Sequence, residues 1–363
     1  MITTIYKSRF HFLPVAALLL WSCTTENVSV ECSQPEFVNS FPKEVRLDPV
    51  EPFMTDLAGM VNFVANDSLL VGLFQQDPYL KVYSLESGEP LGSFITKGQG
   101  PGEFTGMPTN LSVCETSEGP KLRFMEQWKK RYHTMDLTSS IYSQKEVYDT
   151  IVESKNFKDI KYLIPMPSAD TIAWYYNMAD GGVMRIINSQ SGQASIPNLG
   201  NLEADWSEFD DNIISFIPAF SIGADVVAEA MTHLNQINMY SLSDSTFRKT
   251  ICVGEKIDNV AAEDSKSRDN RKRAYQGAQA IGNYFVFLYN GATESDFVKG
   301  DANTELQIFS NEGKPVVHIA LPIPANSFFI DRSGKLFLFS YLGESESVYR
   351  YEIPEIQSII NVN

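Results

Sequence analysis

Histidine is the side chain in this sequence best suited to holding a catalytic metal, and the chain has four. A shared metal in a ring of β-sheets would need several histidines at equivalent positions of the innermost strands. The repeat described below places His133 in a third strand, His233 just before one, and His318 in a fourth strand. Because none of them falls in an innermost strand, we expect no metal site, and each is better explained as a packed or surface histidine.

Acidic clusters are the second candidate for chemistry. They stand at residues 203–211 (EADWSEFDD) and 296–305 (DFVKGDANTE). Asp301, Asn303 and Glu305 alternate as in a calcium loop, but the glycine and the terminal glutamate of such a loop are missing at the proper spacing. A solvated acidic loop is the alternative. There is no GxSxG sequence and no Ser/His/Asp set that spacing supports, so we expect neither a catalytic triad nor a cofactor.

Aromatic side chains could stack on sugar rings. Trp174, Tyr175, Tyr176 and Trp206 are the candidates, although core packing explains Trp174 equally well.

Four cysteines occur at wide spacing, with no CxxC pair and no Cys/His cluster that would hold zinc. An N-terminal Cys23 belongs to the leader discussed next, and Cys32, Cys114 and Cys252 remain. An odd number of widely spaced cysteines is no disulfide framework. We expect Cys114 and Cys252 to behave as small apolar core residues.

The N-terminus has the pattern of a secretory signal. Lys7 and Arg9 precede an apolar run, FHFLPVAALLLW, that is too short to span a bilayer. The run ends Leu20-Trp21-Ser22-Cys23, which resembles a bacterial lipobox, with Trp21 departing from the commoner residue at its position. The resemblance implies cleavage before Cys23 and lipidation of that cysteine. An ordinary signal peptide with an incidental cysteine is the alternative.

These features predict a signal peptide over 1–22, a polar tether over 23–35 and a folded domain over 36–363. The formal net charge is -16, and no basic run is longer than residues 129–131 and 271–273, so we expect no nucleic-acid partner. Removal of residues 1–22 would leave 27 Lys and Arg against 45 Asp and Glu, a formal net charge of -18 that an anionic membrane surface repels. A lipid would therefore have to hold the protein in the cell envelope. Few acidic residues follow Cys23, which favours the periplasmic face of the outer membrane.

A repeat organises the rest of the chain. A strand, a short polar turn and a second strand recur six times, at separations of 52, 52, 53, 69 and 42 residues. Such a period in an all-β chain is typical of a propeller, so we predict six four-stranded blades. The residues expected at equivalent positions of the third strands are Tyr83, Met135, Ile187, Tyr240, Phe309 and Tyr351.

Two insertions interrupt the repeat, one at 198–212 and one at 255–276, and the second has the composition of a short surface helix. Closing the ring requires its two ends to meet. We expect the run Pro42–Pro49 to add a strand to the blade built by the C-terminal residues.

The run KGQGPGEF (97–104) could be a phosphate loop or a turn. A phosphate loop needs a following helix whose amides face the anion, and Pro108 argues against one. We therefore expect a turn that leads from the last strand of one blade to the first strand of the next. In it, Phe104 would be packed and Glu103 would cap backbone amides.

GxGPGEF after the first blade resembles the TolB-like six-bladed propeller lipoproteins of Bacteroidetes. The motif stands here as Gly98, Gly100, Pro101, Gly102, Glu103 and Phe104. The likeness extends over about residues 36–363, including 273–291 and 328–341. It implies the fold and the compartment, and says little about activity.

Three functions remain open on these grounds. The first is a non-catalytic binding or scaffold propeller for a glycan, a peptide or a protein. The second is a hydrolase or lyase acting on a carbohydrate or peptide through carboxylates at the channel mouth. The third is a subunit of an outer-membrane assembly. For a ligand site we predict the basic insertion at the channel mouth, with Arg271 and Arg273 first, then Lys266 and Arg268.

Overall fold

The computed structural model describes residues 34–360 except 154–159, 166–170, 178–181, 190–191, 196–212, 214, 222, 245 and 342–345. Between 152 and 212 it describes strands but not side chains. The fold is mostly β, and the described strands form six sheets, of which five have four or five strands and one has three.

Each sheet is antiparallel through its consecutive strands. The first four sheets are β3 (Met60–Ala65), β4 (Leu69–Phe74), β5 (Leu80–Ser84) and β6 (Pro90–Phe94); β7 (Thr109–Thr116), β8 (Gly119–Glu126), β9 (Arg131–Asp136) and β10 (Tyr148–Glu153); β11 (Ile160–Pro165), β12 (Thr171–Asn177), β13 (Gly182–Ser189) and β14 (Gly192–Ser195); and β15 (Phe216–Ser221), β16 (Val226–Met231), β17 (Gln236–Ser241) and β18 (Arg248–Val253). The last two are β19 (Lys272–Ile281), β20 (Tyr284–Thr293), β21 (Glu305–Ser310) and β22 (Pro315–Ala320); and β23 (Ser327–Ile330), β24 (Lys335–Ser340) and β25 (Ser347–Glu352).

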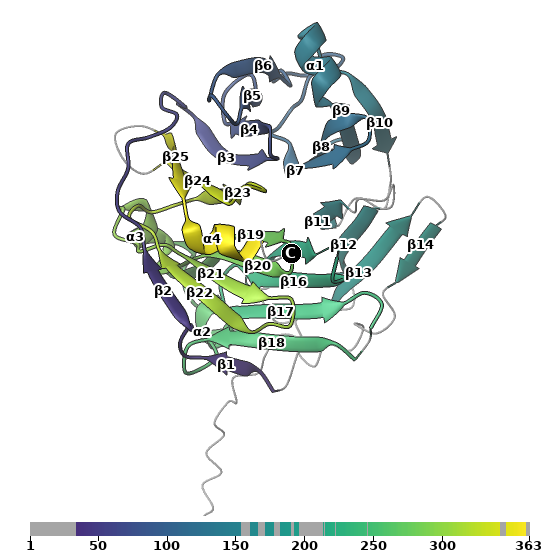
Figure 1. Cartoon of the computed structure of the whole chain (residues 1–363). Helices are drawn as coiled ribbons and strands as arrows, with labels where there is room; N and C mark the ends of the chain where they lie inside the picture. Colours follow the sequence, from purple (N-terminus) through teal and green to yellow (C-terminus); the bar gives the residue numbers. More distant parts are fainter. Residues whose placement is uncertain are drawn as a thin grey trace, which may run out of the picture.

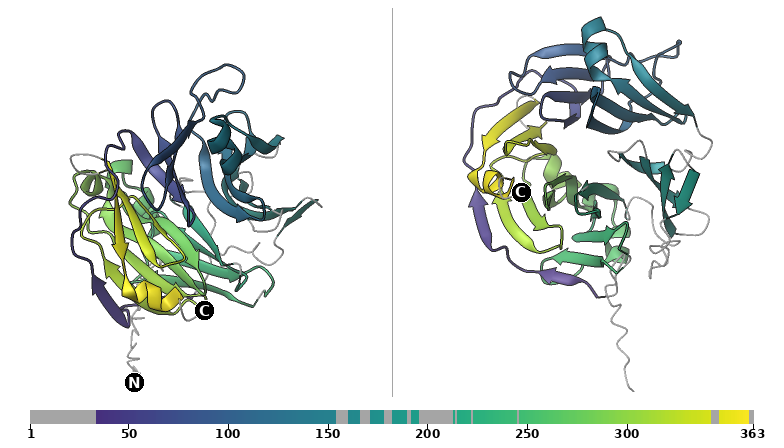
Figure 2. Two further views of the ribbon diagram at one scale, coloured as in Figure 1. Left: turned by 45° about the horizontal axis from the view of Figure 1, so that its top comes forward. Right: turned by 45° about the vertical axis from the view of Figure 1, so that its right-hand side comes forward.

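The first strands of the sheets contact one another in the order β3, β7, β11, β15, β19, β23 and back to β3. The sheets therefore stand around a common axis, as in a β-propeller (Figure 1, Figure 2). Apolar side chains fill the spaces between neighbouring sheets. One such layer joins the fifth sheet to the sixth through Leu288 and Leu336, and another joins the first to the second through Val82 and Phe124.

Antiparallel order gives the ring two distinct faces. Turns from first to second and from third to fourth strands lie on one side, which we call the turn face. Turns from second to third strands and the connections between sheets lie on the other side, which we call the loop face. Short helices decorate both: α1 (Leu137–Ser143) on the turn face, and α2 (Val260–Asp264), η3 (Arg268–Asn270) and α3 (Glu294–Val298) on the loop face.

The predicted register of the repeat is confirmed. Each of its six marker residues lies in the third strand of its sheet, in the order β5, β9, β13, β17, β21 and β25. The three histidine placements also hold, because His133 lies in β9, His233 precedes β17 and His318 lies in β22.

The N-terminal segment does not close the ring in the predicted way. Its first strands, β1 (Glu36–Val38) and β2 (Lys43–Arg46), pair in parallel with β18 and β22, the outer strands of the fourth and fifth sheets (Figure 1). The run Pro42–Pro49 was expected on the C-terminal sheet. That sheet is instead reached by Met54, which exchanges backbone hydrogen bonds of 3.0 and 2.9 Å with Val348 of β25.

The last of the six repeats was expected to end in a second strand. Its final residues instead form the helix α4 (Pro354–Ile360). Proline suits the first turn of a helix, where its missing N–H costs no hydrogen bond. Ile356 and Ile359 are buried and stand three residues apart, which is a helical spacing.

The motif at 97–104 is a tight turn between β6 and β7, and the geometry of the turn requires glycine at each of its three glycine positions. Glu103 N donates to Gly100 O at 3.1 Å around Pro101 and Gly102, whose φ of 83° only glycine adopts freely. Glu103 Oε2 accepts from Gly100 N at 2.7 Å. A Cβ on Gly98 would lie 1.9 Å from that oxygen, and one on Gly100 3.0 Å from it.

The rest of the motif pairs with itself. Gly98 N donates to Phe104 O and Phe104 N donates to Thr96 O, both at 2.9 Å, and the Phe104 ring is buried beside Phe124 and His133. The amides that a phosphate would need are thus used by the protein, and the strand β7 follows instead of a helix.

Gly98→Ala should destabilise the fold by about 1–3 kcal/mol, because the new methyl group displaces Glu103 and breaks its bond to Gly100. Gly223→Ala is the matched control, since a Cβ there meets no atom within 4 Å and the residue lacks a positive φ. Urea unfolding of both variants measures the difference. Equal stability of the two would show that the turn does not need Glu103 in this position.

His318 should make the attachment of β2 depend on pH. Its ring contacts Glu305 Oε2 through Nε2 at 2.7 Å and Glu44 of β2 through Nδ1. Hydrogen bonding to Glu305 and Glu44 outweighs burial and raises the pKa of His318 to about 9 from an ordinary 6.5. The stabilisation is therefore complete below about pH 6.5 and is lost as pH rises through about 9.

The measurement compares His318→Gln with wild type at pH 6 and pH 9.5. We expect a loss on the order of 2 kcal/mol at the lower pH and little at the higher. Lys249→Gln is the control, because it removes the 2.9 Å ion pair with Glu36 that attaches the neighbouring strand β1 without involving a histidine. A loss in His318→Gln that does not change with pH contradicts the assignment.

Candidate functional site

A cavity of about 630 Å³ opens at the axis on the turn face, and we call it the axial cavity. Its described lining comes from the places where the first strands of five sheets end and turn into the second strands. Its lining is Ala65, Asn66, Asp67, Ser112, Val113, Cys114, Glu115, Ala219, Phe220, Ala278, Gln279, Ala280, Ile281, Gly282, Phe329, Ile330 and Arg332.

The cavity exists because the innermost strands carry small residues there. Ala65, Ala219, Ala278 and Ala280 project only a methyl group, where larger side chains would fill the axis. Gln279 ties two of these strands together: its Nε2 donates to Ile330 O at 2.7 Å and its Oε1 accepts from Ile330 N at 2.8 Å. The wall is therefore fixed by hydrogen bonds between sheets, and its surface is mostly apolar.

Polar and charged groups gather at the rim of the axial cavity. Arg332 Nε pairs with Asp67 Oδ2 at 2.9 Å, and Arg332 N donates to Asp67 Oδ1 at 2.8 Å. Asn66 Nδ2 donates to Glu115 Oε1, which joins the first sheet to the second. The hydroxyl of Ser112 is buried and has no hydrogen-bond partner within the described structure. A ligand would thus meet an apolar floor and a rim that carries both signs of charge.

A second hollow, of about 380 Å³, continues from the rim between the first and sixth sheets. The ion pair of Asp67 and Arg332 borders both hollows. Arg350 and Lys335 line the second one, and Arg350 Nη1 donates to Glu86 O at 3.1 Å while its guanidinium lies over the Phe53 ring at 4.2 Å. The second hollow carries both signs of charge, since Asp67, Glu86 and Asp331 line it together with Arg332, Lys335 and Arg350, and an elongated ligand could run from the axis into it.

Neither described cysteine is an activated nucleophile. Cys114 lines the axial cavity, but burial raises the pKa of its thiol, and its Sγ lies 3.6 Å from Lys121 O. Cys252 is fully buried and burial raises its pKa to about 12. Both thiols stay protonated at neutral pH. The lining within the described residues also contains no histidine to act as a base.

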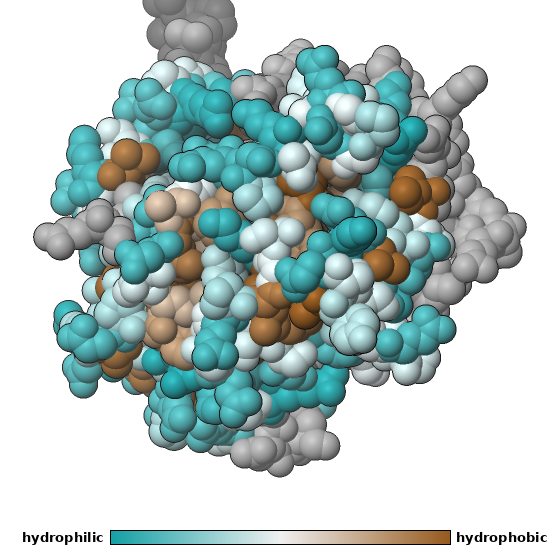
Figure 3. All heavy atoms as spheres, turned by 90° about the horizontal axis from the view of Figure 1, so that it is seen from above, coloured by the Kyte–Doolittle hydropathy of each residue, from teal (hydrophilic) through white to brown (hydrophobic). Residues whose placement is uncertain are grey.

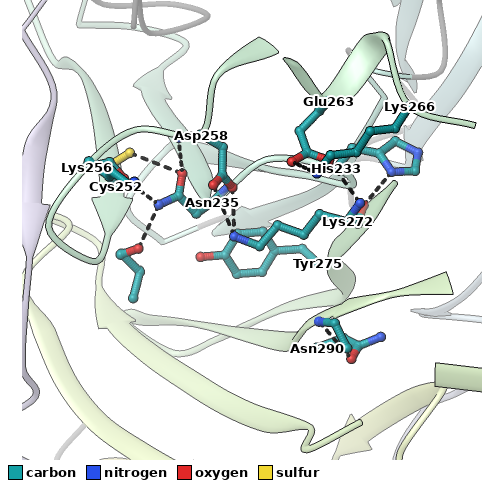
Figure 4. Close-up of polar contacts among 12 residues, drawn as sticks. His233, Asn235, Cys252, Lys256, Asp258, Glu263, Lys266, Lys272, Tyr275 and Asn290 are labelled. Atoms are coloured by element: carbon teal, nitrogen blue, oxygen red, sulfur yellow. Dashed lines mark hydrogen bonds and ion pairs between the residues drawn. The ribbon is translucent and has the colours of Figure 1, made fainter. Parts of the chain in front are cut away.

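The predicted basic site on the insertion is largely neutralised by its own acids (Figure 4). Lys266 Nζ lies 2.6 Å from Glu263 Oε1, and Lys272 Nζ lies 2.9 Å from Asp258 Oδ2. Burial lowers the pKa of Lys272, but Tyr289 and Asp258 outweigh it, so the net change is upward.

The arginines of the insertion also have partners. Arg271 is buried and its Nη2 donates to Asp264 O at 3.0 Å, while Arg273 pairs with Glu294 at 3.2 Å from the start of β19. Arg268 is exposed. The structure therefore places these residues on the loop face but does not bring them together around one ligand position.

Asn235 and Asp258 fix the base of this insertion. Asn235 N donates to Asp258 Oδ2 at 2.8 Å, and Asp258 N donates to Asn235 Oδ1 at 3.0 Å (Figure 4). His233 Nδ1 donates to Lys272 O at 2.7 Å, which leaves its Nε2 as an acceptor, and burial lowers the pKa of this ring. The cluster binds the insertion to the fourth sheet, which is a structural role.

The calcium candidates, the cysteines and the aromatic candidates from the sequence remain to be located in the structure. Of the three residues considered for calcium, Asp301 and Asn303 are exposed, and Glu305 uses both carboxylate oxygens, one for Gln307 and one for His318. In the described part of the chain no three His, Cys, Asp or Glu side chains gather as a metal would require. Cys23, Cys32, Trp206 and the insertion 198–212 lie outside the described residues, as do the side chains of Trp174, Tyr175 and Tyr176.

Sequence reasoning did not find the axial cavity, because alanines in a strand carry no chemical signal of their own. It also passed over Trp128, whose side chain is 79% exposed at the tip of the β8–β9 hairpin. The sequence Trp-Lys-Lys-Arg at 128–131, an aromatic residue followed by three basic ones, could have indicated this surface. Among the described residues, no helix is long and apolar enough to cross a bilayer.

A solved structure with a TM-score above 0.5 supports the fold. The chain is similar to a member of the DUF4221 family from Bacteroides vulgatus, with a TM-score of 0.54 and 9% identity over 83% of this chain and 96% of that one. It also matches a calcium-binding protein, regucalcin, from Agrobacterium tumefaciens, with a TM-score of 0.47 and 10% identity over 86% of this chain and 95% of that one. No protein-family model and no curated protein matches the sequence. At these identities the similarity shows a β-propeller and assigns no family and no activity.

Proposed function

We propose that this protein is a lipid-anchored binding propeller of the cell envelope that takes its ligand in the axial cavity. The observation that carries the proposal is a cavity of about 630 Å³ with a small-residue wall fixed by hydrogen bonds between sheets. Preformed, mostly apolar hollows with a few polar groups are the usual form of ligand sites, and the end of a propeller axis is a usual place for one.

The ring that supports this site has six blades in our proposal. The three-stranded sheet β23–β25 is its sixth blade, and the segment at Phe53–Met54 supplies the missing outer position. In support of this, Phe53 N and Met54 N both donate to Val348 O, at 2.8 and 3.0 Å. One chain segment would then cover the outer edges of the fourth, fifth and sixth blades in turn.

Binding is favoured over catalysis by the chemistry of the lining. The thiol that faces the cavity is held protonated, and its rim carboxylates are engaged, Asp67 by Arg332 and Glu115 by Asn66. A peptide or a short glycan with an apolar part and a polar or charged end suits the apolar floor and the charged groove beside it.

The anchor is part of the same proposal. The Leu20–Cys23 sequence would direct cleavage and lipidation of Cys23, with residues 1–22 removed and 24–35 left as a tether. The protein would then be held at the periplasmic face of the outer membrane.

Cys23→Ser should move the protein from the membrane fraction to the soluble fraction, because the lipid, rather than surface charge, holds it there. Cell fractionation with immunoblotting measures this, and Cys32→Ser is the matched control. A Cys23→Ser variant that stays in the membrane fraction contradicts the anchor but leaves the cavity proposal intact.

Ala280→Phe should abolish ligand binding, because the ring fills the axial cavity. Full-length protein is screened by thermal shift against short peptides and short oligosaccharides, where a ligand at a hundred times its Kd stabilises by about 2.7 kcal/mol. A ligand of the cavity should stabilise wild type and fail to stabilise Ala280→Phe.

Ala262→Phe is the control, since it makes the same change on the exposed surface of α2. Stabilisation of Ala280→Phe equal to that of wild type rules out the axial cavity as the site. Conversion of a bound compound to product would replace the binding function by an enzymatic one.

A further inference from the structure

An exposed tryptophan marks a second surface, on the loop face and away from the axial cavity. Trp128 lies in the turn Gln127–Lys130 between β8 and β9, which closes with Lys130 N donating to Gln127 O at 3.2 Å. Its side chain is 79% exposed. A large aromatic group kept in water contributes little to folding, and such groups are concentrated at binding sites.

The turn that carries Trp128 is held firmly against the motif loop. The nitrogen edge of the indole lies over Gly106, where a Cβ would come within 2.7 Å of Nε1. Lys129 Nζ donates to Glu103 O at 2.8 Å and lies 2.8 Å from Glu126 Oε1. Because Lys129 is tied to the motif loop and the indole edge lies against Gly106, the indole is preorganised for a partner.

Lys130, two residues after Trp128 in the same turn, supplies a cation to this tip. Lys130 is partly exposed, and its ammonium group has no hydrogen-bond or ion-pair partner among the described residues. The nearest carboxylates are occupied: Glu126 is buried against Lys129 and His133, and Glu103 accepts from Gly100 N. In a chain of net charge -16, this tip presents a local positive charge and an aromatic face.

We propose that the tip of the β8–β9 hairpin binds an acidic polysaccharide, with Trp128 stacking on a sugar ring and Lys130 pairing with a carboxylate. The small apolar area favours this occupant. Only Met107, 38% exposed, adds apolar surface from the same loop, whereas a stable protein partner buries about 800 Å² on each side around an apolar core. Seen from above, the surface of the molecule is a mosaic in which hydrophobic patches are separated by hydrophilic side chains (Figure 3).

The test measures binding of full-length protein to three uronate polymers, polygalacturonate, alginate and hyaluronate, by affinity electrophoresis, with neutral dextran as reference. Wild type should bind at least one of them more tightly than dextran, and the affinity should fall as salt is raised. Trp128→Ala should weaken binding about 10-fold or more, and Lys130→Gln about 3- to 10-fold. Trp128→Phe should keep most of it, because a phenyl ring still stacks.

Tyr142→Ala is the matched control, because Tyr142 is 92% exposed but lies in α1 on the turn face. It should bind as wild type does. The proposal is overturned if none of the three polymers binds, or if Trp128→Ala binds as well as wild type. Binding to vesicles of anionic lipid that is lost in Trp128→Ala, with no polymer bound, would assign the tip to a membrane surface instead. Ala280→Phe should leave polymer binding unchanged, which separates this site from the axial cavity.

Discussion

A radial sheet leaves an outer edge whose amides and carbonyls must find partners, and this requirement shapes the whole chain. The N-terminal segment supplies backbone partners to the outer edges of three neighbouring sheets in succession, through β1, β2 and Met54. Ion pairs strengthen the first two additions, Lys249 with Glu36 and His318 with Glu44. The same segment then enters the first sheet as its innermost strand, so it joins the outside of the ring to its axis.

At the axis the constraint is crowding rather than an unpaired edge. Six first strands approach one another there and leave little room for side chains. Alanine and glycine relieve the crowding on the turn face and leave the axial cavity. Gln279 replaces lost packing with two hydrogen bonds to Ile330 of the next sheet. The cavity is thus a consequence of closing the ring, and its rim is where charged turn residues such as Asp67 and Arg332 can meet across sheets.

The repeat was readable from sequence because each blade carries its own local signal, an aromatic or aliphatic strand residue before a polar turn. Tyr83 and Phe309 could be aligned without knowing what either one touches. Pairing between distant segments has no such signal: β2 meets β22 more than 270 residues away in the sequence, and nothing local distinguishes that edge from the edge of β25. The helix α4 was missed because Ile356 and Ile359 fit a short apolar strand as well as a helical face. The cavity was missed because it depends on how distant strands meet at the axis, where Ala65, Ala219 and Ala280 line one hollow.

The two faces carry different chemistry, and the topology relates each to the N-terminal tether. β1 runs parallel to β18, so the chain enters the outer edge of the fourth sheet from the side of the turn face, the side on which the axial cavity opens. Residues 24–35 extend at most about 40 Å. An anchor at Cys23 would therefore hold the outer edge of the fourth sheet, where β1 pairs with β18, within about that distance of the membrane. The axial cavity and Trp128 lie on opposite faces of the ring, so one molecule could occupy the cavity without covering the indole.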